Sequence, residues 1–100
     1  MSKNVRSEAV DHLFEAIMTL KDKEEFYAFF EDVCTVKELK DIAQRLEVAE
    51  MLRAGKSYQT VSAEIGASTA TISRVNRCLV YGTGGYATVL ERLGDTEENK

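Results

Sequence analysis

The residues best suited to binding a charged ligand are hydroxyl-bearing and cationic side chains between Ser57 and Leu79. Serine and threonine hydroxyls bond to phosphates and base edges, and arginine guanidinium groups pair with phosphate or with guanine. The stretch from Arg53 to Leu79 holds four cations against Glu64 alone, a local charge of +3, whereas the chain's net charge of −4 leaves −7 for the rest. We therefore expect nucleic-acid contact to be confined to this segment; a solvated basic surface is the alternative.

The spacing of polar caps, glycines and apolar residues in this segment predicts two short helices joined by a tight turn. Ser57 and Ser68 are suited to begin the helices, because a serine oxygen accepts a hydrogen bond from a free amide of the first turn. Gly66 suits a turn that needs a positive φ. The apolar residues that would pack in the angle between the helices are Val61, Ile65, Ile72 and Val75. This pattern is typical of a helix-turn-helix.

The outward face of the second helix is predicted by the 100° rotation per residue. Ile72, Val75 and Leu79 form one buried stripe, and the opposite face carries Ala70, Ser73, Arg74 and Arg77. Short side chains near the amino end, with arginines further along, suit a helix in a major groove. The predicted DNA-binding residues are Ser57, Gln59 and Thr60 of the first helix and Ser68, Thr69, Ala70, Ser73, Arg74 and Arg77 of the second. A helical hairpin with a merely soluble outer face is the alternative.

Catalytic, metal and nucleotide sites are not indicated by the remaining candidates. Cys34 and Cys78 stand far apart with one histidine, His12, whereas a structural zinc site usually needs four ligands. The run from Gly82 to Gly85 has no following Lys-Ser/Thr and no preceding strand, so it is interpreted as a flexible connection rather than a phosphate loop. The sequence also offers no Ser/His/Asp set. We expect no enzyme activity, no metal and no cofactor.

The elements that must position this segment are predicted to be helices throughout. Proline is absent, and apolar residues recur at spacings of three and four. A first helix is expected over residues 5–20, and Asp22 with Glu25 is expected to begin a second. Thr35 and Glu38 form a stricter capping box before a long helix that ends at Gly55.

The chain is expected to be one helical domain, residues 1–94. Its parts are amino-terminal dimerisation helices (1–34), a long helix with the helix-turn-helix (35–80) and a short last helix (86–93), followed by a polar tail (95–100). The longest apolar run has four residues, far from the about 20 of a membrane span, and charges in the first fifteen residues argue against a secretory signal. A cytoplasmic protein without membrane contact is expected.

From residue 35 to residue 80 the chain resembles the Trp repressor superfamily, above all its YerC/YecD group. The matching stretches are Ile42-Ala43-Gln44-Arg45-Leu46, Leu52-Arg53-Ala54-Gly55-Lys56-Ser57 and Ile65-Gly66-Ala67-Ser68-Thr69-Ala70-Thr71-Ile72-Ser73-Arg74. The resemblance implies an all-α fold in which two chains interlace their amino-terminal helices. It also implies a homodimeric repressor that presents two reading heads to double-stranded operator DNA.

Two physical arguments also favour a dimer. Two reading heads one helical turn apart, about 34 Å, contact more base pairs than one head and select a palindromic site. The first two helices carry more apolar surface than a small monomer is expected to bury. The residues are Leu13, Ile17, Phe26, Phe29 and Phe30. The alternative is that these residues close on their own core.

In Trp repressor the effector lies between two arginines, which the resemblance matches to Arg45 and Arg74, with Cys78 at a third contact position. Val75 stands where that repressor has glycine, and Cys78 replaces a serine. A β-branched side chain would fill space that an indole needs, and a thiol is a poorer hydrogen-bond partner, so both departures argue against tryptophan. Three roles stay open for the arginines: binding a smaller anionic effector, contacting DNA phosphates, or forming ion pairs with Glu47 and Glu50.

Two function classes follow. The first is a homodimeric, sequence-specific DNA-binding regulator of transcription. The second is a helical protein-interaction module that keeps the motif as scaffold and uses its acidic remainder and aromatic second helix as the binding surface.

Overall fold

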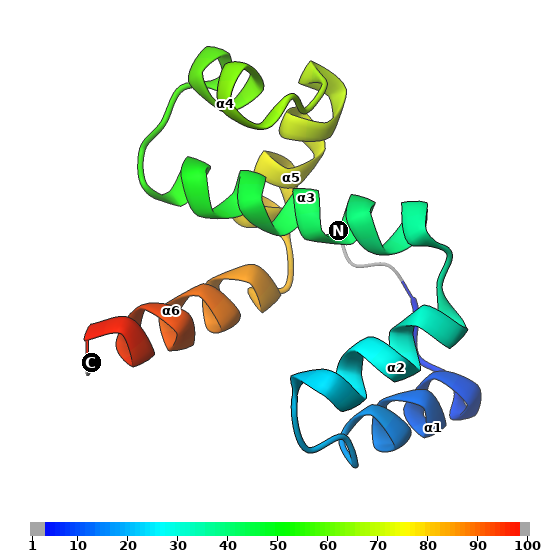
Figure 1. Cartoon of the computed structure of the whole chain (residues 1–100). Coiled ribbons are helices and arrows are strands. Elements are labelled where there is room, and N and C mark those ends of the chain that lie inside the picture. The colour runs from blue at the N-terminus through cyan, green and yellow to red at the C-terminus, as the bar shows by residue number, and fades with distance from the viewer. Residues whose placement is uncertain (1–3, 99–100) are drawn as a thin grey trace. The chain divides into compact units, whose positions relative to one another are not determined.

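In the computed structural model, residues 4–98 are described, with side chains as far as Gly94, and their secondary structure is entirely helical (Figure 1). The helices are α1 (Glu8–Ile17), α2 (Lys23–Val33), α3 (Val36–Arg53), α4 (Tyr58–Ile65), α5 (Thr69–Tyr81) and α6 (Gly85–Glu98). The predicted all-α class is confirmed. The chain divides within α3 into two compact units, one up to Lys40 and one from Asp41 onward.

The first unit contains α1 and α2, and side-chain caps set where each helix begins. Helix α1 is shorter than the predicted span of 5–20, because the Ser7 side chain accepts a hydrogen bond from the Val10 amide at 3.1 Å and thereby caps the helix. Asp22 caps α2 as predicted: its Oδ1 accepts from the Glu25 amide at 3.0 Å. Glu25 reaches back to the amide of Lys21 at 2.8 Å, one residue before the cap.

The apolar side chains of this unit cluster without being buried. Phe29 and Phe30 meet edge to face with ring centroids 5.4 Å apart, and Phe26 stacks on Phe30 at 6.3 Å. Neither α1 nor α2 contains a buried residue. The hydrophobic faces of these helices are therefore only partly removed from water within one chain.

Helix α3 begins at the predicted capping box. The Glu38 amide donates to Thr35 Oγ1 at 3.0 Å, and Glu38 Oε1 accepts from the Thr35 amide at 2.8 Å. At the other end, Gly55 has φ +88°, as expected for a glycine just beyond a helix.

The second unit is built around a small core that the helix-turn-helix shares with α3. The core residues are Val48, Ala49, Val61, Ala67, Ile72 and Val75. The predicted packing of Val61, Ile72 and Val75 in the angle between α4 and α5 is confirmed, while Ile65 is only partly buried against it. In Figure 1, α5 leads from the α4 side of α3 to the side where α6 lies.

The last helix is longer than predicted. It was expected over 86–93, with a polar tail from residue 95, but α6 runs from Gly85 to Glu98. Gly94 has no positive φ and continues the helix, at the modest cost of a glycine in a helix interior. Of the predicted polar tail, Asn99 and Lys100 lie outside the described residues. Across the part of the chain that is described, none of the helices combines the length and apolar character needed to cross a membrane.

Candidate nucleic-acid interface

The turn between α4 and α5 is built from local caps that the sequence specifies. Ser57 Oγ accepts from the Thr60 amide at 3.1 Å and begins α4, and Ser68 Oγ accepts from the Thr71 amide at 3.1 Å and begins α5. Between them Gly66 ends α4 with φ +81°, and its amide donates to the Ser62 carbonyl at 2.8 Å. The buried Ala67 then places the turn against the core.

Several of the predicted DNA-binding hydroxyls have a local partner in addition. Ser57 Oγ lies 3.0 Å from Thr60 Oγ1, and Ser68 Oγ lies 3.1 Å from Thr71 Oγ1. Each pair of hydroxyls therefore stabilises the first turn of its own helix, α4 or α5. Gln59 and Thr69, which neighbour them, are exposed.

The two faces of α5 differ as the helical rotation predicts. Ile72 and Val75 are each 1% exposed and belong to the core. The four residues of the opposite side are all exposed: Ala70, Ser73, Arg74 and Arg77. We call these four residues the outer face of α5. The described part of the chain leaves this face open to solvent.

The four cations between Arg53 and Leu79, the basic segment, differ in their contacts. Arg53 Nη1 donates to the Ala87 carbonyl of α6 at 3.1 Å, so this guanidinium turns toward α6. Lys56 is exposed in the connection before α4, and Arg74 and Arg77 extend from the outer face of α5. Positive charge near the outer face thus comes from Arg74 and Arg77.

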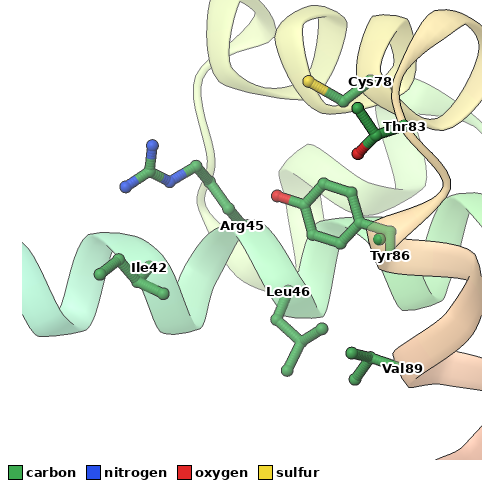
Figure 2. A pocket seen from close by; sticks show the side chains of 8 residues that line it. Ile42, Arg45, Leu46, Cys78, Thr83, Tyr86 and Val89 are labelled. Carbon is green, nitrogen blue, oxygen red and sulfur yellow. The ribbon is translucent and has the colours of Figure 1, made fainter. Parts of the chain in front are cut away.

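A pocket of about 530 Å³ is lined by residues of α3, α5, α6 and the connection between α5 and α6. Its lining residues are Ile42, Arg45, Leu46, Cys78, Thr83, Gly85, Tyr86 and Val89. Figure 2 shows the Tyr86 ring on the same side of the pocket as Cys78 and Thr83, with its hydroxyl directed toward Arg45. Of the three predicted effector residues, the pocket brings together Arg45 and Cys78, and Arg74 is not among its lining residues.

Tyr86 is the pocket residue that sequence reasoning missed. Burial raises the pKa of its hydroxyl above the usual 10.0, the Cys78 thiol adds to the rise, and Arg45 opposes it. Arg45 itself donates from Nε to the Asp41 carbonyl one turn earlier, at 3.3 Å. The available signal was an aromatic residue directly after the glycine-rich run, which was interpreted as a connection only.

Metal chemistry finds no support in the described residues, because no three His, Cys, Asp or Glu side chains gather there in a way that could hold an ion. The two cysteines are free, and Cys78 is exposed.

The chain is similar to known proteins in sequence and in structure. The model of the Trp repressor protein family matches residues 8–94. The uncharacterized protein YerC of Bacillus subtilis (strain 168) is 54% identical over 93 residues, which are 93% of this chain and 89% of that protein.

Two solved structures are also similar. A crystal structure of a candidate Trp repressor from Staphylococcus aureus superposes with a TM-score of 0.86 at 50% identity, covering 90% of each chain. A TrpR-like protein from Eubacterium eligens gives 0.87 at 56% identity, covering 90% of this chain and 93% of the other.

The all-α fold is that of the Trp repressor-like proteins, which are a family of DNA-binding regulators and not of enzymes. The chain belongs to the Trp repressor family.

Proposed function

We propose that this protein is a sequence-specific transcriptional repressor that binds double-stranded operator DNA as a homodimer. One observation carries the proposal: on α5, Ile72 and Val75 are buried while the outer face is exposed along its whole length. A packed scaffold with an uncovered polar face is what a recognition helix requires.

The residues of the outer face have the sizes that entry into a major groove demands. Ala70 and Ser73 are short, as is the neighbouring Thr69, so the amino end of α5 can come close to base edges. Arg74 and Arg77 lie further along and reach bases or phosphates. The amino end of α4 begins at the cap residue Ser57 and carries the exposed Gln59 and the partly exposed Thr60, and it can present first-turn amides to a phosphate.

The homodimer is supported by the first unit. Burying apolar area is the main favourable term in folding and association, and α1 and α2 bury no residue within one chain. Phe14, Met18, Tyr27 and Val33 are all more than half exposed. A second copy of the chain that interlaces these helices would cover them and place two reading heads for one palindromic site. Such a repressor acts where the operator DNA is, in the cytoplasm.

The effector is proposed to be a small anion that uses Arg45. A guanidinium pairs with a carboxylate, and Cys78 and Tyr86 border the same pocket. If Arg45 and Arg74 instead contact DNA phosphates, or form ion pairs with Glu47 and Glu50, free amino acids should not stabilise the protein.

A thermal-shift screen of amino acids on the wild type and on Arg45→Ala separates these roles. A rise in melting temperature that Arg45→Ala abolishes supports the effector. Stabilisation by tryptophan would overturn the argument from Val75.

The proposal is tested by the salt dependence of binding to a duplex selected from a random pool. Arg77→Ala removes one phosphate-reaching cation, so we expect weaker binding and a log–log salt slope shallower by about 0.9. Arg6→Ala, which removes the same charge from an exposed site outside the helix-turn-helix, is the control and should leave the slope unchanged.

Equal binding by Arg77→Ala and wild type at every salt concentration would show that α5 does not face the duplex. Absence of any binding at low salt, with a protein partner recovered from nuclease-treated lysate, would instead favour the interaction module.

A further inference from the structure

The side chain of Arg53 joins helix α6 to the end of α3 by two polar contacts. Arg53, the last residue of α3, donates from Nη1 to the Ala87 carbonyl at 3.1 Å. Its Nη2 lies 3.8 Å from Glu91 Oε1. The Arg53 side chain is 37% exposed and that of Glu91 67%, so the carboxylate contact is the weaker of the two.

The two contacts hold α6 at points one helical turn apart. Ala87 and Glu91 are four residues apart and share one face of the helix. Tyr86 and Leu90, one residue earlier in each case, form the neighbouring stripe that packs against the core. Because Arg53 engages two successive turns, it constrains the rotation of α6 about its own axis.

The connection and the packing leave this rotation weakly determined. The turn from α5 contains Gly82 and Gly84, which has φ +86°, and Gly85 begins α6; glycine restricts the backbone least. Among the α6 residues whose side chains are described, none is fully buried. A helix with a glycine-rich connection and partial packing depends on such contacts for its orientation.

The rotation of α6 matters because α6 forms one wall of the pocket. Tyr86 and Val89 line it from α6, facing Ile42, Arg45 and Leu46 of α3 (Figure 2). A small rotation would move the Tyr86 ring away from Arg45 and Cys78.

We propose that Arg53 is a positioning residue that fixes the rotation of α6, and with it the Tyr86 wall of the pocket, rather than a contact to DNA phosphate. The claim about α6 stands on the contacts alone; only the exclusion of a phosphate contact rests on the proposed function. Arg53 therefore belongs with the pocket although it lies in the basic segment.

The first test measures α6 directly in Arg53→Ala, Arg53→Lys and the control Lys56→Ala, which removes a neighbouring exposed cation. Hydrogen exchange of the α6 amides should quicken by about fivefold in both Arg53 variants, since lysine keeps the charge but cannot reproduce the two-point contact. NMR titration of the Tyr86 ring should show its pKa returning toward 10.0 as burial is lost. Lys56→Ala should match wild type in both measurements.

Unchanged α6 exchange and unchanged Tyr86 titration in both Arg53 variants would overturn the proposal. Should Arg53→Ala fail to fold, Arg53→Lys decides alone. In DNA binding, both Arg53 variants should keep the wild-type salt slope. A slope lost in Arg53→Ala and restored in Arg53→Lys would identify a phosphate contact instead. If wild type binds no DNA, the proposed function fails while the exchange and titration results still decide the role of Arg53.

Discussion

Gly66 shows how a single residue sets the geometry of the reading head. Its φ of +81° lies in the left-handed region, and no atom lies within 4 Å of where a Cβ would stand. The cost of a side chain there is therefore backbone strain alone, with no collision. Gly94 differs from Gly66 in its backbone only. A Cβ at Gly94 would also have open space around it, but this residue lies inside α6 without a positive φ.

The same substitution should consequently have opposite signs at these two glycines. Gly66→Ala should lower the free energy of unfolding by about 1–2 kcal/mol, the cost of a left-handed L-residue. Gly94→Ala should raise it by about 0.5–1 kcal/mol, the usual advantage of alanine over glycine within a helix. Urea unfolding of both variants measures this, and equal destabilisation by both would contradict the assigned backbone conformations.

At the scale of elements, the sequence predicts the features that depend on residues close together in the chain. Ser57, Ser68 and the Thr35–Glu38 box mark where helices begin, because each needs only residues three positions apart. Packing across longer separations gave no such signal: the Arg53–Ala87 bond joins residues 34 positions apart, and Tyr86 reaches Cys78 and Arg45 only once α6 has docked. The end of α6 was missed because the residues from position 95 onward are polar, and a polar run without apolar periodicity does not by itself indicate a helix.

The capping box of α3 makes the helix sensitive to acid. The hydrogen bond from the Thr35 amide, and then that from its side chain, lowers the pKa of the Glu38 carboxyl below the usual 4.5. A carboxyl whose folded pKa is depressed contributes stability above its unfolded pKa and loses it as the pH falls through the folded value. The contribution of Glu38 should therefore be present at neutral pH and decline as the pH falls below about 4.5 toward the folded pKa.

Carboxyl NMR titration of the folded protein and of the urea-unfolded chain tests this directly. Glu38 should titrate at lower pH in the folded protein, and Glu38→Gln should make unfolding less dependent on pH in that acidic window. Identical titration in the two states would show that the reciprocal bond to Thr35 is absent in solution.

For the whole molecule, the contrast between the two units is informative. The second unit encloses the fully buried core, while α1 and α2 leave every apolar side chain at least partly in water. Met18 is 81% exposed and Phe14 is 53% exposed, four residues apart on one side of the chain's first helical segment. The proposed homodimer accounts for this difference.

A charge introduced on that side should therefore weaken association. In the homodimer, Met18→Glu would place a carboxylate in an apolar interface, so sedimentation equilibrium should show a dissociation constant raised by at least about tenfold. Thr19→Glu puts the same charge at the adjacent exposed position and should change the constant little. A wild-type chain that sediments as a monomer at high micromolar concentration would contradict the dimer.

The most direct test of the proposed function selects duplexes from a random pool with three proteins: wild type, Ser73→Ala and Arg77→Ala, which removes one positive charge. Wild type should enrich a two-fold symmetric sequence, because two copies of α5 read the two half-sites. Ser73→Ala should enrich an altered base at one position of each half-site, whereas Arg77→Ala should enrich the wild-type sequence with lower affinity if it contacts phosphate. If wild type enriches no sequence, the assignment of α5 as the recognition helix is contradicted. It is also contradicted if neither Ser73→Ala nor Arg77→Ala changes the base preference or the affinity.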